Sequence, residues 1–431
     1  MRLDRCLCAL APLVLTACGG DATPSFVDPA PAARTDIRHV VIVVQENHTF
    51  DASFGRYCTA APGSNPTCTA GPACCETVPD HEPGGASPLV LDDARNAAFD
   101  PDHHRDCETA EVHGGAMDQF VTGAPCSKPG NFAVAPASVM AGYYSLLPQA
   151  ALADRYFQPE IGQSSANDMY FAIARHAFVD NTVTPMTAGA DCNYNISIQR
   201  LMGRTVADVL LDAGFTFSVY AEGYAATLAA AAHDAGCPEI PPECPGATGI
   251  YPCIYANSDV PFQYYARFAD NPTYNRDFAQ FARDLRGTLP NVSFIRGYGF
   301  HSEHPGSGTR ITDGANFVTG IVNAVQASPY ASSTLVLVTW DEGGGFFDHI
   351  SPPATNTVDM QPYGTRVPMI ALGRFARRNV VSHVTLEHSS IVRFLEFNYT
   401  GMTGQLGARD AVVNNLGSLL DAAQTGVAVP N

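Results

Sequence analysis

Residues 334–349 read Thr-Leu-Val-Leu-Val-Thr-Trp-Asp-Glu-Gly-Gly-Gly-Phe-Phe-Asp-His, and this stretch decides the fold. The apolar run Leu335–Thr339 predicts a buried strand, because strands covered on both faces are almost continuously hydrophobic. Two carboxylates, Asp341 and Glu342, follow the run, and three glycines then allow a sharp turn close to a ligand. Open α/β sheets bind ligands at the carboxyl ends of their strands, and adjacent buried carboxylates need a cation or a shared proton. The stretch therefore predicts a metal site at a sheet edge.

A second stretch of the same design lies near the start of the chain. Residues 39–55 read His-Val-Val-Ile-Val-Val-Gln-Glu-Asn-His-Thr-Phe-Asp-Ala-Ser-Phe-Gly. The run Val40–Val44 predicts another buried strand, and an acid and an amide follow it. Carboxylate and amide oxygens are the ligands that hard divalent cations prefer. We therefore expect one metal site built from both strand ends, with four ligands: Glu46, Asn47, Asp341 and Glu342.

Strands and helices alternate along the rest of the sequence. Further apolar runs predict strands at Phe215–Ala221, Val292–Ile295 and Val367–Leu372. Helical patterns cover Ala137–Arg155, Thr205–Ala213, Thr273–Leu285, Ala315–Ala327 and His388–Phe397. Such alternation implies crossover connections and a mostly parallel sheet flanked by helices. Because the two acidic strand ends must meet, we expect an α/β fold with a single large catalytic domain over residues 36–431.

The N-terminus has the features of an export signal. Residues 1–17 combine early arginines with the apolar stretch Leu7–Leu15, which is too short to span a membrane. The sequence Leu-Thr-Ala-Cys that ends at Cys18 resembles a lipobox. We expect a lipoprotein acylated on Cys18, with residues 18–35 as a tether, exported and outer-membrane or periplasm-facing. An ordinary cleaved signal peptide, with a periplasmic or secreted product, is the alternative.

Cysteine content agrees with export, and the net charge restricts the partners. Three of the 13 cysteines are Cys6, Cys8 and the lipobox Cys18, and the remaining ten predict disulfides of undetermined connectivity. A zinc cluster is disfavoured because no paired C-x-x-C spacing occurs. We expect the disulfides to pin insertions, roughly Cys58–Cys126 and Cys237–Cys253, above the catalytic edge. The net charge of −18 disfavours nucleic acid as a partner. It also disfavours electrostatic adsorption to anionic lipid, so membrane association should depend on the acyl anchor.

The segment 156–170 supplies candidate nucleophiles. It reads Tyr-Phe-Gln-Pro-Glu-Ile-Gly-Gln-Ser-Ser-Ala-Asn-Asp-Met-Tyr, with a helix expected after the hydroxyls. A helix N-terminus favours a phosphoryl group and supports alkoxide formation at Ser164 or Ser165. The alternative is that the serine only caps the helix. No G-x-S-x-G elbow occurs, so a serine–histidine–acid ester hydrolase has no local support.

Two histidines lie near these motifs. His103 follows Asp-Pro-Asp, and His304 lies after the strand Val292–Ile295, on its carboxyl side. Imidazole can hold the charge of phosphoryl oxygens or protonate a leaving group. The remaining candidates are interpreted as structural or surface histidines: His48, His113, His383 and His388.

Taken in series, six motifs resemble the bacterial phosphoesterase family, which holds non-haemolytic phospholipases C and secreted acid phosphatases. The motifs are Glu46–Asp51 with Phe54-Gly55, Asp100–His103, Gly114–Phe120, Gly162–Tyr170, Ser302–Pro305 and Asp341–His349. They span about residues 37–400. The resemblance implies a fold akin to alkaline phosphatases and sulfatases, a divalent metal ion as cofactor, and a serine or threonine nucleophile.

The resemblance also assigns roles to single residues. It implies metal ligands at Glu46, Asn47, Asp341, Glu342 and Ser164, with Ser164 as nucleophile and His103 and His304 as phosphate contacts. Residues 162–168 lack both prolines and the arginine of the family's Gly-Pro-Thr/Ser-x-Pro-Asn-Arg pattern, so Ser165 competes with Ser164. Ala116 stands where a lysine is common. Asp348 and His349 are interpreted as supporting the turn rather than binding metal.

The expected function is therefore phosphoester hydrolysis through a phosphoserine intermediate. Phosphomonoesters are the expected substrates, because the C-terminal modules usual in phospholipases C of this family are missing. The first alternative is a phospholipase C that cleaves phosphatidylcholine-type phosphodiesters. The second is a non-catalytic surface lipoprotein that binds phosphate or sugar.

Overall fold

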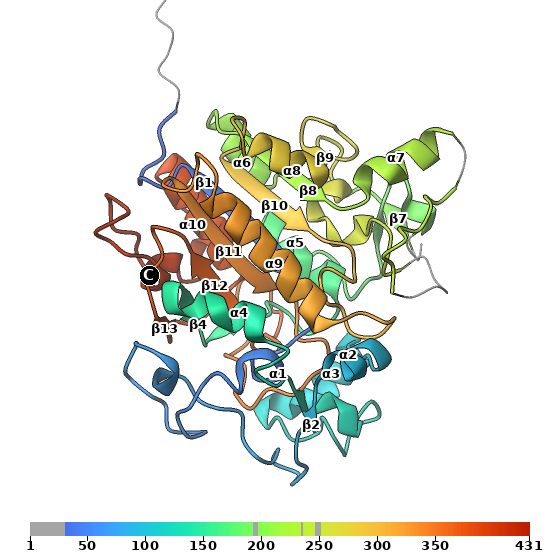
Figure 1. The fold of residues 1–431 in the computed structure, drawn as a ribbon, viewed down its shortest axis with the longest axis vertical. Coiled ribbons are helices and arrows are strands. Elements are labelled where there is room, and N and C mark those ends of the chain that lie inside the picture. Colours follow the sequence, from blue (N-terminus) through green and yellow to red (C-terminus); the bar gives the residue numbers. More distant parts are fainter. Residues whose placement is uncertain (1–30, 193–196, 234–235, 246–250) are drawn as a thin grey trace, which may run out of the picture. The chain divides into compact units, whose positions relative to one another are not determined.

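A sheet of eight strands forms the centre of the molecule (Figure 1). The computed structural model describes residues 31–192, 197–233, 236–245 and 251–431. The strand order is β13-β4-β12-β11-β1-β10-β8-β9. In chain order these strands are β1 (His39–Gln45), β4 (Ala151–Ala153), β8 (Phe217–Ala221), β9 (Asn275–Asp277), β10 (Val292–Arg296), β11 (Thr334–Trp340), β12 (Met369–Leu372) and β13 (Val380–Ser382). The predicted signal peptide and Cys18 lie outside the described residues.

The two strands that decide the fold are neighbours. β1 pairs in parallel with β11 on one side and with β10 on the other. Val44 lies opposite both Thr339 and Arg296, so all three strands end at the same edge. Only β12 runs antiparallel, against both β11 and β4. The mostly parallel α/β sheet expected from the sequence is confirmed.

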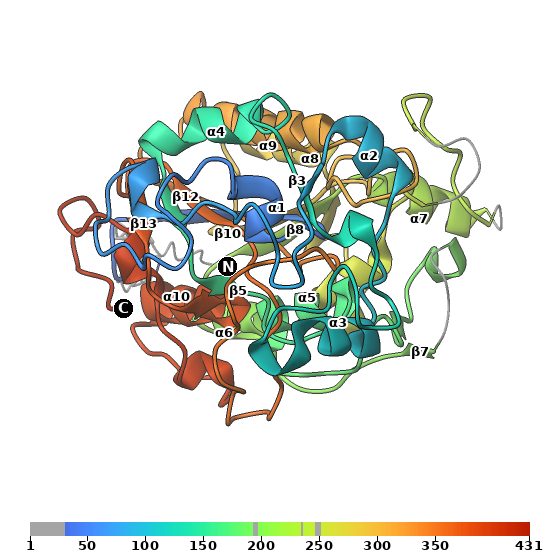
Figure 2. The ribbon, with the colours of Figure 1, turned by 90° about the horizontal axis from the view of Figure 1, so that it is seen from below.

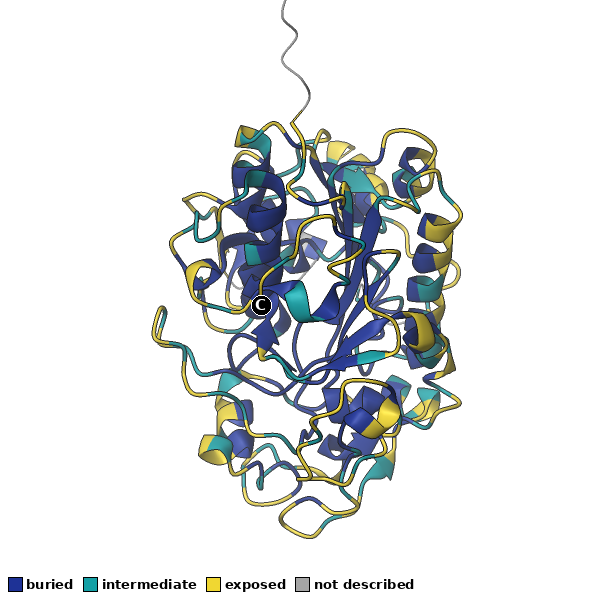
Figure 3. Cartoon of the chain, turned by 90° about the vertical axis from the view of Figure 1, so that its left-hand side faces the viewer, coloured by how far each residue is buried: buried dark blue, intermediate teal, exposed yellow. Residues whose placement is uncertain are grey.

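Helices cover both faces of the sheet (Figure 2). One face carries α4 (Ala141–Leu146) and α9 (Ile311–Gln326), and the other carries α5 (Ser164–Ile173), α6 (Val206–Asp212) and α10 (His388–Thr400). The strands between them are buried (Figure 3). The other helices are α1 (Phe50–Phe54), α2 (Asp93–Ala98), α3 (Arg105–Val112), α7 (Tyr224–Ala232) and α8 (Ala279–Asp284). Short strand pairs outside the main sheet are β2 (Leu89–Val90) with β3 (Ala133–Val134), β5 (Tyr156–Phe157) with β14 (Leu386–Glu387), and β6 (Thr184–Pro185) with β7 (Ile198–Gln199).

Two of the predicted helices are wrong in part. The helix expected over Ala137–Arg155 ends at Leu146, and a short 3₁₀ turn that contains Pro148 follows it. Proline removes a backbone donor and stops an α-helix, and the next residues then form β4 between β12 and β13. Likewise, Asn275–Asp277 forms edge strand β9 against β8, which leaves only Ala279–Asp284 helical. In both places strand pairing overrides the local helical preference.

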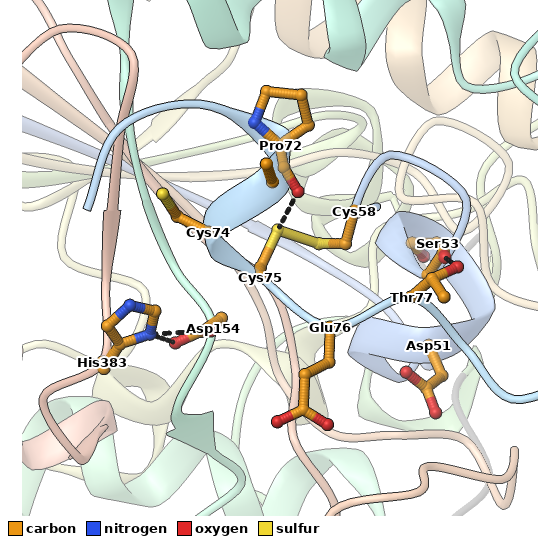
Figure 4. Close-up of a disulfide and its surroundings, with 12 residues drawn as sticks. Asp51, Ser53, Cys58, Pro72, Cys74, Cys75, Glu76, Thr77, Asp154 and His383 are labelled. Atoms are coloured by element: carbon orange, nitrogen blue, oxygen red, sulfur yellow. Dashed lines mark hydrogen bonds and ion pairs between the residues drawn. A yellow bond between two sulfur atoms is a disulfide. The ribbon is translucent and has the colours of Figure 1, made fainter. Parts of the chain in front are cut away.

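All ten cysteines beyond the leader are paired, as expected. The five disulfides are Cys58–Cys75, Cys68–Cys74, Cys107–Cys126, Cys192–Cys237 and Cys244–Cys253. Figure 4 shows the first of them, with the ion pair between His383 and Asp154 nearby. Disulfides of this density indicate an oxidising compartment. Within the described part of the chain, none of the helices has the length and apolar character needed to cross a membrane.

Candidate active site

The ends of β1 and β11 bring four polar side chains together. Glu46 and Asn47 leave β1, while Asp341 and Glu342 leave β11, and all four are buried. Asp341 Oδ1 accepts hydrogen bonds from the backbone N–H of Asn47 (3.1 Å) and of Glu342 (2.8 Å). The predicted meeting of the two strand ends is therefore observed.

The glycines after β11 make this contact possible. Asn47 has φ +63°, and Gly344 has φ +64°. A Cβ atom at Gly344 would overlap the carbonyl oxygen of Asn47, so only glycine fits at this position. The triple glycine thus allows the β11 loop to pass against the β1 loop.

Two histidines face Asn47 from separate loops. Asn47 Nδ2 lies 3.3 Å from His103 Nε2 and 3.1 Å from His304 Nε2. In each ring Nδ1 faces a backbone carbonyl, that of Pro101 at 2.9 Å and that of Pro305 at 2.8 Å. We therefore assign the Nδ1–H tautomer to both, which leaves both Nε2 atoms directed at the site.

Ser164 joins the same group of residues. It is the first residue of α5, and its Oγ donates a hydrogen bond to Asn47 Oδ1 at 3.3 Å. The Ser165 hydroxyl instead donates to Asp259 Oδ1 at 3.3 Å. Of the two candidates, the structure brings Ser164 to the predicted metal ligands, whereas Ser165 is turned towards another carboxylate.

A cavity of about 390 Å³ opens above this cluster. Its lining residues are Glu46, Asp100, His103, His104, Gln163, Ser164, Asn181, Thr184, Tyr251, Ala256, Ser258, Asp259 and His304. The cavity can therefore admit a small phosphoester to the serine and both histidines. Ala116, at the position where the family commonly has a lysine, lines a different hollow beside Ser351.

Carboxyl groups dominate this cluster. Burial raises the pKa of Glu46 to about 8 and that of Asp341 to about 7, and it raises the pKa of Glu342 well above its usual value. Arg296, at the end of β10, approaches Asp168 Oδ2 at 2.7 Å and Glu46 Oε1 at 3.4 Å. This single guanidinium faces the acids of β1, β11 and α5 together. Further positive charge would stabilise the cluster.

The donor set fits a divalent cation. Asp341 Oδ2 and Glu342 Oε1 are buried without a hydrogen-bond partner among the described residues. Buried carboxylate oxygens of this kind are costly unless a cation or a donor meets them. With the Glu46 carboxylate and the Asn47 amide oxygen they form an all-oxygen ligand set, the kind preferred by hard divalent ions.

A second acidic cluster is already neutralised by an arginine. Asp51, Asp348 and His349 lie close together, and Arg366 donates to Asp51 Oδ1 (2.9 Å) and to Asp348 Oδ1 (2.8 Å). His349 Nδ1 lies 2.7 Å from Asp51 Oδ2. Asp348 and His349 therefore hold the loop in place, which agrees with the supporting role expected of them.

Sequence reasoning missed other residues of the site. Arg296 ends a predicted strand at the same edge as Glu46, so the strand-end argument could have found it. Asp168 belongs to the motif Gly162–Tyr170, but the motif alone did not indicate that its carboxylate pairs with Arg296. Tyr251 and Asp259 lie in segments without the hydrophobic periodicity of a helix or strand. The one sequence signal for Tyr251 is that the insertion Cys237–Cys253, which contains it, is expected above the catalytic edge.

Comparisons with known proteins identify the family of the chain. The sequence profile of the Phosphoesterase family matches residues 37–400. Phospholipase C B of Mycobacterium tuberculosis is 27% identical over 452 residues, covering 94% of this chain and 81% of that protein. Non-hemolytic phospholipase C of Pseudomonas aeruginosa is 30% identical over 227 residues, covering 42% of this chain and 33% of that protein.

Solved structures share its outline only distantly. A protein of the alkaline phosphatase superfamily from Vibrio parahaemolyticus superposes with a TM-score of 0.37 and 11% identity, covering 89% of this chain and 71% of that one. The lipoteichoic acid synthase LtaP of Listeria monocytogenes gives 0.39 and 7%, with 85% and 73% covered. The family profile, in contrast, spans the described domain almost from end to end. The chain belongs to the Phosphoesterase family and is a hydrolase that acts on phosphoester bonds.

Proposed function

We propose that this protein hydrolyses phosphoesters with Ser164 as nucleophile, through a phosphoserine intermediate. The observation that supports this best is the position of the Ser164 hydroxyl. It lies 3.3 Å from Asn47 Oδ1, at the N-terminus of α5, in the cavity that His103 and His304 also line. A helix N-terminus stabilises the negative charge of the phosphoryl group and of a serine alkoxide.

The chain's own residues divide the reaction between them. Ser164 Oγ attacks phosphorus, the bond to the leaving oxygen breaks, and water later cleaves the phosphoserine. The Nε2 lone pair of His103 or His304 takes the proton that Ser164 Oγ loses on attack. The imidazolium formed in this way directs Nε2–H at the phosphoryl group and returns the proton to the leaving oxygen. Glu46, Asn47, Asp341, Glu342 and the Ser164 hydroxyl would hold a divalent ion. When bound, such an ion lowers the hydroxyl pKa and offsets phosphoryl charge.

Substitution of Ser164 tests the assignment. Ser164→Ala should lower kcat on p-nitrophenyl phosphate by on the order of 10³-fold or more at an unchanged melting temperature, because the attacking oxygen is lost. Ser165→Ala is the matched control, since its hydroxyl meets Asp259 instead. Full activity in Ser164→Ala, or an equal loss in Ser165→Ala, would contradict the proposal.

Phosphomonoesters are the substrates we propose. Phospholipase C activity is the second candidate, because relatives of that name align over most of this chain. Parallel assays with p-nitrophenyl phosphate and p-nitrophenylphosphorylcholine separate the two, since only a phosphodiesterase turns over the second. Cleavage of neither ester, with any of several divalent metals added, would contradict both candidate substrate classes.

We also propose that the protein is an exported lipoprotein anchored through Cys18. The support is the lipobox-like sequence at Cys18 together with the disulfides of the described domain. Wild type should fractionate with membranes and incorporate labelled palmitate, whereas Cys18→Ala should do neither. Equal membrane association of both proteins would contradict the anchor.

A further inference from the structure

Tyr251 lies in the active-site cavity, although none of the sequence motifs contains it. It lies two residues before Cys253, which forms a disulfide with Cys244. The same cavity is lined by Ser164, Glu46 and His304. This insertion therefore contributes a side chain to a site whose other parts come from the sheet edge.

The ring of Tyr251 is held from two sides. It packs edge-on against His304, with centroids 5.1 Å apart and an interplanar angle of 78°. On another side is Gly299, where a Cβ atom would come within 2.7 Å of Tyr251 Cζ and 2.8 Å of its Oη. Only a glycine leaves room for the ring here, so the phenol occupies a defined position beside a proposed phosphate contact.

The Tyr251 hydroxyl has an unused hydrogen bond. Its Oη is buried and has no hydrogen-bond partner of good geometry among the described residues. Oη lies near the Glu46 carboxyl group, where it partly offsets the rise in the pKa of Glu46. The contact does not have the geometry of a regular hydrogen bond. A buried hydroxyl without a partner is unfavourable, because it has lost its hydrogen bonds to water. An acceptor brought in by the substrate would remove that cost.

We propose that Tyr251 is a further catalytic residue, which donates a hydrogen bond from Oη to a non-bridging oxygen of the phosphoryl group. The proposal rests on the proposed function, since it places the phosphoryl group between Ser164 and His304. A phenol keeps its proton up to about pH 10, so the group acts as a donor throughout the physiological range. A donor fixed in advance stabilises charge that develops in the transition state without reorganisation.

Tyr251→Phe tests this directly, because it keeps the ring against His304 and removes only Oη. With p-nitrophenyl phosphate we expect kcat to fall by about 10²-fold while KM changes little, as for the loss of one oxyanion donor. Inhibition by vanadate, which mimics the transition state, should weaken more than inhibition by inorganic phosphate. The melting temperature should stay that of wild type.

Tyr298→Phe is the matched control. Tyr298 follows β10 and packs on Phe300, and it does not line the cavity. This variant should keep wild-type kcat and vanadate inhibition. Equal losses in both tyrosine variants, or a wild-type kcat in Tyr251→Phe, would overturn the role of Tyr251. A variant whose phosphate and vanadate inhibition weaken equally, with kcat retained, would overturn it too.

These outcomes are separable from failure of the proposed function. If Ser164→Ala is inactive while Tyr251→Phe equals wild type, only the role of Tyr251 is lost. If wild type cleaves no phosphoester, or Ser164→Ala remains active, the proposed function itself fails.

Discussion

Asn47 connects the parts of the active site. Its side chain reaches both histidines and the Ser164 hydroxyl, and its backbone N–H binds Asp341. It does so in the left-handed conformation, which asparagine tolerates better than most residues. One residue thus sets the distance between nucleophile, imidazoles and carboxylates.

The close approach of Gly344 to Asn47 gives a prediction at this scale. Gly344→Ala should lower the free energy of unfolding by more than about 2 kcal/mol, because the left-handed conformation costs alanine roughly 1–2 kcal/mol and the overlap adds to it. Activity should fall as well, since Asn47 must move. Urea unfolding and kcat measure the two effects.

Gly63 provides the control for that substitution. It has φ +73°, close to that of Gly344, but an added Cβ atom would meet nothing within 4 Å. Gly63→Ala should therefore cost only about 1 kcal/mol and leave activity intact. Equal costs at the two positions would show that the contact with Asn47 does not matter.

At the scale of helices, strands and loops, one network of ion pairs connects the insertion around the Cys58–Cys75 disulfide with the loop that follows β11. His349 contacts two carboxylates. Its Nδ1 lies 2.7 Å from Asp51 in α1, and its Nε2 lies 3.2 Å from Glu76, beside the Cys58–Cys75 disulfide. Arg366 pairs with both Asp51 and Asp348. The network joins α1, the insertion and the loop after β11.

This network predicts a dependence of stability on pH. The attraction of Asp51 raises the pKa of His349 against the opposing effects of burial and Arg366, so the imidazolium stabilises the folded state. Its contribution is complete below the unfolded pKa of about 6.5 and is lost as pH rises through the higher folded value. Asp51 and Glu76 have lowered pKa values, so their contributions are lost only under more acidic conditions.

Urea unfolding of wild type and His349→Gln checks this. The difference in unfolding free energy should be larger at about pH 5.5 than at about pH 9, because only the wild type loses an imidazolium between them. His113→Gln is the control: His113 pairs with Asp118 at the exposed surface, and its substitution should have little effect at either pH. A constant difference for His349→Gln would refute the network's role.

On the scale of the whole molecule, the proposed metal joins two distant parts of the chain. Four of its five proposed ligands follow β1 and β11, which pair along their full length in the centre of the sheet, and the fifth, Ser164, begins α5. A ligand that binds only the folded protein stabilises it by about 2.7 kcal/mol at 100 times its Kd. Metal binding should therefore stabilise the entire domain.

Removal of metal tests this at the same scale. Chelation should abolish activity and lower the melting temperature of wild type, and one added divalent ion should restore both. Asp341→Asn with Glu342→Gln should show a melting temperature that no longer responds to chelator, because the ligand charges are gone. If chelator changes neither the activity nor the melting temperature of wild type, the proposed metal site is wrong.

Much of the fold could be predicted from local pattern. β1, β10, β11, α6, α9 and α10 were expected nearly where they lie, because fully buried strands and amphipathic helices have distinct periodicities. β4 and β9 were not, since Ala151–Ala153 and Asn275–Asp277 become strands only by pairing with neighbours. Short edge segments have too few residues for periodicity to outweigh such contacts.

The export signal, the fold class and the two acidic strand ends with their proposed ligands could all be predicted from the amino-acid sequence. These depend on neighbouring residues, because a parallel strand places its next few residues at the carboxyl edge of the sheet. Only the tertiary structure decided which cysteines pair, which serine faces Asn47, and that Tyr251 and Arg296 reach the site. Those facts depend on how loops and strands distant in sequence pack together, and packing of that kind leaves no local periodic trace.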